Sequence, residues 1–244
     1  MQIRGMIVSL VFALAAGSVA AADNPPAPGF DAAGSDARAV EIADRTMDAM
    51  GGRARWDAVQ CLAWEIFGRR HTWNKWTGDY RLEDGDQLVI MNINDGQGRV
   101  WKGGAELEDG PEKAGALDRA RSVWINDAYW VFMPYKLKDT GVTLKYLGER
   151  AAEDGRAADV LGLTFAGVGD TPENRYEVLV DRETGLVSQW SYFEKATDTE
   201  PQITSAWNNW HDFGGIKLAE RDGRRAVTGI RVSADACPNA FKAP

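Results

Sequence analysis

Residues 36–72, DARAVEIADRTMDAMGGRARWDAVQCLAWEIFGRRHT, decide the fold, because the spacing of their apolar residues changes halfway along. In the first half the apolar positions are three and four residues apart, at Val40, Ala43, Met47 and Met50. This period predicts an amphipathic helix over 36–50, which Gly51 and Gly52 end. Residues 53–59 are expected to add a short helix that returns Trp56 to the buried face.

After Cys61 the period changes to two, since Leu62, Trp64 and Ile66 alternate with the residues between them. This alternation predicts a β-strand, and the segment continues to residue 72. Further strands are expected at 79–82, 87–94, 99–102, 142–147, 157–165, 175–180, 186–193, 203–211, 216–220 and 224–232. Short turns rich in Gly and Asp separate most of them, which favours a meander of neighbouring antiparallel strands.

One helical segment interrupts the strands and divides them into two groups. Its apolar residues recur at steps of three and four, at Leu117, Ala120, Trp124, Ala128 and Val131. They predict a helix over about 112–133 that Pro134 ends. The fold class predicted is therefore α+β, with a curved antiparallel sheet and helices packed over its concave face.

The N-terminal segment has the pattern of a secretory signal peptide. Arg4 precedes an apolar run, and small residues then allow cleavage after Ala20 or after Ala22. We expect residues 1–22 to be a signal peptide, residues 23–35 to be a flexible leader rich in Pro and Gly, and residues 36–244 to be a single domain. The apolar run is too short to span a bilayer, so the expected location of the mature chain is the periplasm, as a soluble protein.

Composition and motifs exclude several classes of function. The formal net charge is −8, so nucleic acid is a poor partner. The two histidines, His71 and His211, lie in no metal-ligand spacing, and no nucleophile or phosphate-binding motif is present. We therefore expect no metal, no cofactor, no catalytic residue and, on balance, no enzyme. The polar segment 69–71 is expected to face water.

Two cysteines remain after the signal peptide. Cys61 opens the first strand and Cys237 lies just past the last one. In an oxidising compartment, a disulfide between them would tie the tail to the sheet. Two separate thiols, one buried and one loose, are the alternative.

The chain contains ten tryptophans, several on expected strands and two on the interrupting helix. A curved sheet covered by helices would gather these rings around one space, and an apolar cavity results if the helices leave that space unfilled. A plain aromatic core is the alternative for any single ring. The predicted wall residues of the cavity are Trp64, Ile66, Trp101, Trp124, Trp130, Phe132, Trp190, Tyr192 and Trp207.

The stretch 126–149, NDAYWVFMPYKLKDTGVTLKYLGE, resembles secreted bacterial proteins of the LolA/LolB-like superfamily, the carriers that sort outer-membrane lipoproteins. The segments 49–56, 167–176, 180–186 and 210–218 share the resemblance, which covers about 39–232. It implies a half-open β-barrel with helices over its concave face and an apolar pocket for acyl chains. The characterised carriers use an arginine near the pocket, but no arginine of this sequence matches their motif.

Three functions follow from these patterns. The leading one is a non-enzymatic periplasmic carrier or binding protein for an apolar small molecule, a lipid or a lipidated partner. The second is a carbohydrate-binding or carbohydrate-cleaving envelope protein, for which Trp73 and Trp76 would be exposed platforms. The third is a ligand-free interaction module of the envelope. The sequence does not predict an oligomeric state.

Overall fold

The structure is a computed structural model that describes residues 24–167, 173–237 and 239–243. The predicted signal peptide, residues 1–22, lies outside these residues. The described helices are α1 (Ala37–Ala49), α2 (Arg53–Ala58) and α3 (Pro111–Phe132), with 3-10 turns at η1 (Met133–Lys136) and η2 (Gly223–Arg225). The three helices expected from the apolar period are confirmed, to within one residue at each end.

The strands form two large antiparallel sheets and one small pair. The first, sheet A, has the order β14-β1-β2-β3-β4-β5-β6, and the second, sheet B, has the order β11-β10-β9-β8-β7. The strands of sheet A are β1 (Cys61–Ile66), β2 (Arg69–Asn74), β3 (Asp79–Asp84), β4 (Gln87–Asn92), β5 (Gly98–Lys102), β6 (Ala105–Glu106) and β14 (Val227–Ser233). Those of sheet B are β7 (Val142–Ala151), β8 (Ala157–Phe165), β9 (Arg175–Asp181), β10 (Val187–Phe193) and β11 (Ile203–Ala206). The pair is β12 (Trp210–Asp212) and β13 (Lys217–Ala219).

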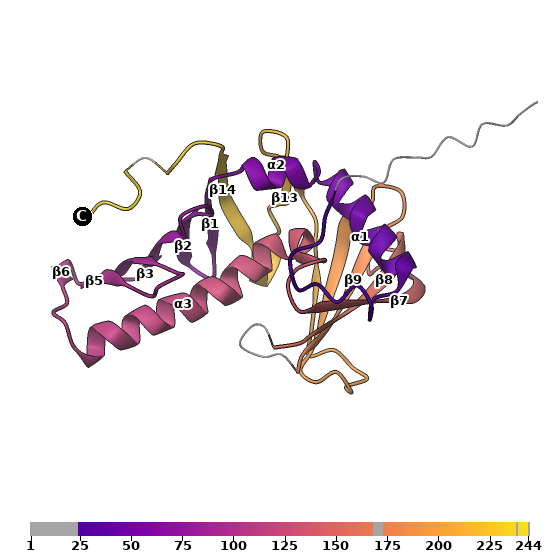
Figure 1. Cartoon of the computed structure of the whole chain (residues 1–244), viewed down its shortest axis with the longest axis horizontal. Helices are drawn as coiled ribbons and strands as arrows, with labels where there is room; N and C mark the ends of the chain where they lie inside the picture. The colour runs from indigo at the N-terminus through magenta and orange to yellow at the C-terminus, as the bar shows by residue number, and fades with distance from the viewer. Residues whose placement is uncertain (1–23, 168–172, 238, 244) are drawn as a thin grey trace, which may run out of the picture.

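Each of the two large sheets has one long helix lying along it. In Figure 1, α3 runs along sheet A from β5 and β6 toward the middle of the molecule, and α1 lies beside β7 of sheet B. The C-terminal end of α3 reaches the junction of the two sheets, where it contacts β13. The predicted α+β class with a curved antiparallel sheet is confirmed.

Glycines in bulges help to bend both sheets. In β14, Gly229 has φ 61° where the register with β1 gains one residue, and in β7, Gly148 has φ 94° where the register with β8 gains one residue. A residue without Cβ adopts this left-handed conformation at little cost, and the extra residue bends the strand and increases its twist.

One expected strand is divided in two. The alternation predicts a continuous strand over 203–211, but β11 ends at Ala206 and β12 begins at Trp210. Asn209 has φ 54°, which an extended strand cannot contain. The break separates the β12–β13 pair from sheet B.

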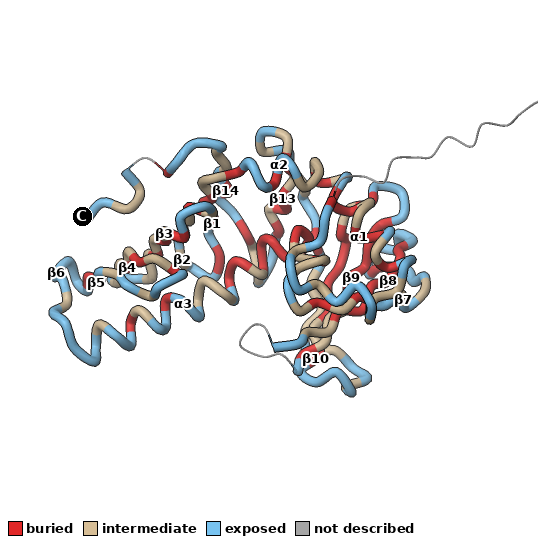
Figure 2. The backbone as a smooth tube through the Cα atoms, in the orientation of Figure 1, coloured by how far each residue is buried: buried red, intermediate tan, exposed pale blue. Residues whose placement is uncertain are grey.

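The interior consists of two large apolar clusters and one small one. The largest joins α1, α2, the C-terminal half of α3 and both sheets, and the second lies between the N-terminal half of α3 and strands β3 to β5. In Figure 2 the buried backbone is concentrated where α3 meets β1 and where α1 meets sheet B. The N-terminal half of α3 is mostly exposed and buries only two small side chains, Ala116 and Ala120.

The segment expected to be a flexible leader differs from that expectation over residues 24–35. The backbone amide of Asp31 donates to the carbonyl of Val142 on β7 at 3.0 Å, and the backbone amide of Leu144 donates to the Ser35 hydroxyl at 2.9 Å. Asn24 is 5% exposed and bonds to the Asp48 side chain. Because β7 is the edge strand of sheet B, it offers unpaired backbone groups that a segment without its own core can use.

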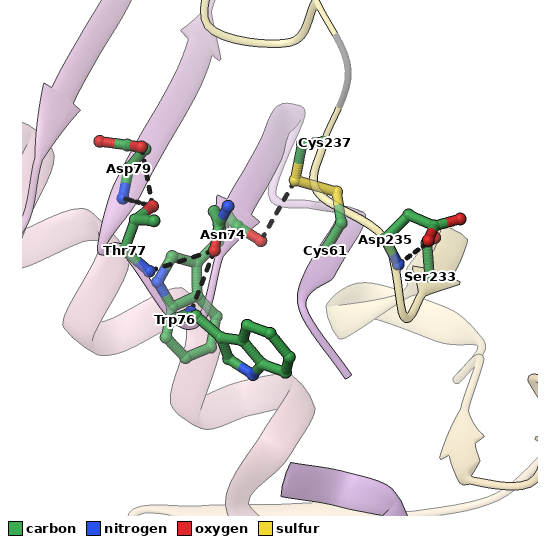
Figure 3. Close-up of a disulfide and its surroundings, with 9 residues drawn as sticks. Cys61, Asn74, Trp76, Thr77, Asp79, Ser233, Asp235 and Cys237 are labelled. Atoms are coloured by element: carbon green, nitrogen blue, oxygen red, sulfur yellow. Dashed lines mark hydrogen bonds between the residues drawn. A yellow bond between two sulfur atoms is a disulfide. The ribbon is translucent and has the colours of Figure 1, made fainter. Parts of the chain in front are cut away.

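A disulfide closes the edge of sheet A. Figure 3 shows Cys61, at the start of β1, bonded to Cys237 in the tail that follows β14, with a Cα–Cα distance of 5.2 Å. Cys61 already lies opposite Ser233 in the register of the two strands, so the bond adds a covalent link to a pairing that hydrogen bonds define.

We expect reduction of this disulfide to lower the free energy of unfolding by about 4–5 kcal/mol, because the bond closes a loop spanning a sequence separation of 176 residues in the unfolded chain. Urea denaturation with and without reductant measures the difference. The Cys61→Ser, Cys237→Ser double variant should match the reduced protein and be insensitive to reductant. Equal midpoints for oxidised and reduced protein would contradict the expectation.

Candidate functional site

The candidate site is the aromatic interior where the C-terminal half of α3 meets both sheets. The ring of Trp130 on α3 packs edge-on against Trp190 of β10, with centroids 4.6 Å apart. The preceding residue of the helix, Tyr129, lies 5.4 Å from Tyr176 of β9. Toward sheet A, Trp124 lies 5.2 Å from Trp73 of β2. These rings form a lining that extends from sheet A to sheet B beneath one helix.

The structure brings together eight of the nine residues predicted to line a cavity. Six are buried in the largest apolar cluster: Trp64, Ile66, Trp130, Phe132, Trp190 and Trp207. Trp124 and Tyr192 are half-buried and pack against this cluster. Whether the space they surround opens to a ligand stays a prediction.

Trp101 lies elsewhere. Its neighbour Val100 on β5 faces α3 in the second apolar cluster, so the alternation of the strand turns Trp101 to the opposite face of sheet A. There the Arg99 guanidinium lies 4.6 Å from the centre of its ring, and Glu106 bonds to Arg99. Trp101 is 6% exposed, but it does not belong to the aromatic interior beneath α3.

The two tryptophans offered as sugar platforms also differ from each other. Trp76 is 59% exposed, and its indole Nε1 donates to the carbonyl of Asp57 at 3.0 Å. Trp73 is half-buried against Trp124 under α3. Because only one of the two rings faces solvent, they do not form a shared platform.

A buried network of polar side chains joins α3 to sheet A. The carboxylate of Asp127 on α3 is fully buried and receives two hydrogen bonds from the guanidinium of Arg69 on β2, at 2.8 and 3.0 Å. His71 Nε2 lies 3.2 Å from the same carboxylate, and its Nδ1 lies 2.8 Å from the hydroxyl of Tyr80 on β3. Trp64 stacks flat on the His71 ring at 4.7 Å. The expectation that segment 69–71 faces water is wrong for His71, which is buried, and holds only in part for Arg69, which is half-buried against Asp127.

A second buried cation lies at the junction of the sheets. Arg221 is 2% exposed, and its Nη2 donates to the carbonyl of Trp130 at 2.7 Å. Its guanidinium lies 4.2 Å from the centre of the Trp207 ring and 5.3 Å from that of Trp130. No carboxylate among the described residues pairs with it, and its Nε and Nη1 have no hydrogen-bond partner there. Burial lowers the pKa of Arg221 to about 10.

The interior also contains other donors without partners. Within the described residues, the buried polar atoms of the site that have no hydrogen-bond partner include Trp64 Nε1, Trp73 Nε1, Trp124 Nε1, Trp190 Nε1, Trp207 Nε1 and the Tyr129 hydroxyl. An unsatisfied buried donor costs about 1–3 kcal/mol. Apart from the phenol, all of these groups donate and none accepts, so the interior is complementary to acceptor atoms.

Two cavities lie at the edges of this interior. One of about 20 Å³ is lined by residues of the 24–35 segment, α1 and η1. The other, about 150 Å³, is lined by side chains around Trp207 and Trp210, and we call it the Trp207–Trp210 cavity. Of the nine residues predicted to line a cavity, only Trp207 lines either of these two.

The described part of the chain holds no group of three or more His, Cys, Asp or Glu side chains that could bind a metal ion. None of its helices combines the length and the apolar character that a membrane crossing needs.

Neither family models nor curated proteins give a match to this sequence. Among solved structures, the chain is similar to a DUF1329 family protein from Desulfovibrio piger, with 12% identity and a TM-score of 0.43, over 84% of this chain and 97% of that chain. It is also similar to the LolA superfamily protein NE2245 from Nitrosomonas europaea, with 10% identity and a TM-score of 0.36, over the same shares of the two chains. A third similarity is to the MucA/MucB complex of Pseudomonas aeruginosa, with 18% identity and a TM-score of 0.24, over 85% of this chain and 62% of that chain. The superfamily that the sequence resembles is thus among these structures.

We expect Asp127→Asn to lower the free energy of unfolding by about 2–4 kcal/mol, because it removes the buried charge that compensates the half-buried Arg69. Asp118→Asn on the exposed side of the same helix is the matched control and should change it by less than about 0.5 kcal/mol. Chemical denaturation monitored by circular dichroism measures both. If the two variants are equally stable, the network does not hold α3.

The tyrosines give a second test of the packing. Burial raises the pKa of Tyr80, Tyr129 and Tyr135 above the ordinary value of about 10. Since the folded pKa exceeds the unfolded one, their contribution to stability is complete below about pH 10 and is lost as the pH rises further. An alkaline absorbance titration should therefore ionise these tyrosines only as the protein unfolds. If all six tyrosines of the chain ionise in one step near pH 10 while the fold is retained, the expected burial of these side chains is contradicted.

Proposed function

We propose that this protein is a non-enzymatic binding or carrier protein of the periplasm that holds an acyl chain of a lipid or a lipidated partner in its aromatic interior. The observation that carries the proposal is the chemistry of that interior, an apolar lining with buried donors that lack acceptors. An acylated molecule supplies both complements, a hydrocarbon chain for the rings and ester or carboxylate oxygens for the donors.

Arg221 is the strongest of these donors. A guanidinium with one hydrogen bond and no carboxylate in the described residues is a costly group to bury, and charged hydrogen bonds are worth about 1.5–3 kcal/mol. An ester or carboxylate oxygen beside its free Nε and Nη1 would complete its hydrogen bonding. The acyl chain would then extend along Trp130 and Trp190.

The N-terminal half of α3 is suited to serve as a movable cover. Beneath it lie large apolar side chains of sheet A, including Tyr80, Leu82 and Val89, whereas the helix buries mainly Ala116 and Ala120 against them. Small side chains give up little contact when a helix is displaced. Trp73 and Trp124 pack against both apolar clusters, so a long acyl chain could continue from the aromatic interior past these two rings to the space under this half of the helix. It would gain about 0.8 kcal/mol for each methylene it buries there.

Two features support the proposed periplasmic location. One is the signal peptide predicted over residues 1–22, and the other is the disulfide, a bond that forms in oxidising compartments. Binding of this kind needs no catalytic group, and Asp127, Arg69 and His71 are engaged with one another.

Binding of a dansylated fatty acid and of its methyl ester to Arg221→Met tests the proposal. We expect the Kd of both probes to rise about tenfold or more, because one charged hydrogen bond is lost. The matched control is Arg225→Met, which also lies 5.3 Å from the Trp130 ring but is half-exposed. It should leave both Kd values within about twofold.

Stability separates this result from simple unfolding. Arg221→Met removes a buried unpaired charge together with one hydrogen bond, so we expect its free energy of unfolding to stay within about 1 kcal/mol of the native value. Native mass spectrometry of protein purified without detergent should show bound lipid in the native chain. Protein that is free of lipid and binds neither probe would instead favour a ligand-free interaction module.

A further inference from the structure

The Trp207–Trp210 cavity lies at the edge of the aromatic interior and shares one residue, Trp207, with it. Its walls come from the β9–β10 turn, the start of β10 and the segment that joins β11 to β12. The residues that line it are Arg156, Asp181, Thr184, Leu186, Val187, Ser188, Trp207, Asn208, Asn209 and Trp210. Asn208 and Asn209 are exposed and Trp207 is 1% exposed, so the cavity leads from solvent to a buried indole.

The charges of the lining cancel. Arg156 Nη1 lies 3.2 Å from the Asp181 carboxylate, and its Nη2 lies 2.7 Å from Asp154. The other oxygen of Asp181 accepts from the amide and the hydroxyl of Thr184, each at 2.7 Å. Since the single cation is engaged by two carboxylates, the cavity attracts no anion, and its remaining polar groups are neutral.

The neutral groups suit a ligand that both donates and accepts hydrogen bonds. The Asn208 amide has no hydrogen-bond partner among the described residues, so it offers a carbonyl and an NH₂ at the rim. The indole Nε1 of Trp207 has none either. The indole of Trp210 is fixed by its hydrogen bond to the Val187 carbonyl at 3.0 Å. Indole faces and edges beside an amide form an apolar wall with a polar rim.

The size limits the ligand to one ring. The volume of about 150 Å³ matches that of an engineered apolar cavity that binds benzene. Here the polar rim requires that the ring carry hydroxyl groups. The wall of the cavity turns at Asn209, whose backbone is left-handed with φ 54°. The side-chain amide of Asn209 donates a hydrogen bond to the Asp222 carboxylate.

We propose that the Trp207–Trp210 cavity is a second binding site that takes one uncharged pyranose ring of a glycan. The ring packs its C–H face on the half-exposed Trp210 indole, and its hydroxyls bond to the Asn208 amide and to the Arg156–Asp181 pair. The same ring chemistry occurs in soluble saccharides and in the headgroups of glycolipids.

Saturation-transfer NMR of the full mature chain with a panel of neutral hexoses, N-acetylhexosamines and their disaccharides tests the site. We expect ring-proton signals for at least one sugar. Asn208→Trp fills the cavity from its exposed rim and should abolish them, whereas Asn208→Ala removes one amide and should raise the Kd about threefold to tenfold. Asn239→Ala in the C-terminal tail is the matched control and should leave the Kd unchanged.

Co-sedimentation with vesicles distinguishes the two sources. Binding to phosphatidylcholine vesicles containing a monoglucosyl lipid, lost in Asn208→Trp, assigns the site to a headgroup, and binding of free saccharides alone assigns it to a soluble glycan. Ring-proton signals that persist in Asn208→Trp, or the absence of signals for every sugar together with no glycolipid binding, would overturn the proposal. A native far-UV circular dichroism spectrum and an unchanged thermal midpoint show that Asn208→Trp is folded, and this control does not depend on whether the protein binds the dansylated fatty acid.

Discussion

The buried carboxylate of Asp127 is the constraint on which the architecture depends. It fixes the middle of α3 against β2 through Arg69 and lies beside His71, which in turn contacts Tyr80 of β3. An uncompensated carboxylate at this depth would be very costly, so the helix has one register on the sheet in which its charge is compensated. Because Trp130 and Phe132 follow on the same helix, the position of the aromatic interior at the sheet junction is set by the same contact.

The interior that this contact positions combines two properties that are rarely found together. Most of it is apolar and aromatic, as in an ordinary core. Yet among the described residues, five indoles and one phenol carry buried polar atoms without partners, and no carboxylate pairs with Arg221. A core selected only for stability would satisfy or remove these groups. Retaining them makes sense if a second molecule supplies the acceptors, which is why the chemistry of the lining outweighs its close packing in the argument for a ligand.

The sequence predicted the elements whose signals are local and missed what depends on contacts between distant segments. The helices over 37–49 and 111–132 follow from the apolar period alone. Asp127 lies on the apolar stripe of the second helix, between Trp124 and Val131, and a carboxylate at that position was a usable signal. For Trp101, the expected strand is confirmed, but the side chain lies on the face of sheet A that points away from α3. Neighbouring residues of a strand point to opposite faces, so an error of one residue in the assignment reverses the face. The 24–35 segment has no core of its own, and only the fold reveals the edge strand that holds it.

Arg221 connects the aromatic interior with the Trp207–Trp210 cavity, because its guanidinium contacts both Trp130 on α3 and Trp207 in the cavity wall. Within the described residues its guanidinium donates one hydrogen bond, to the backbone carbonyl of Trp130, so a movement of the C-terminal end of α3 that breaks this bond leaves the Trp207 ring as its main partner. A cation held to an indole face in a desolvated site is worth about 2 kcal/mol. The position of α3 and the position of the cavity wall are therefore energetically linked through one guanidinium, and a ligand that occupies the free Nε and Nη1 acts on both.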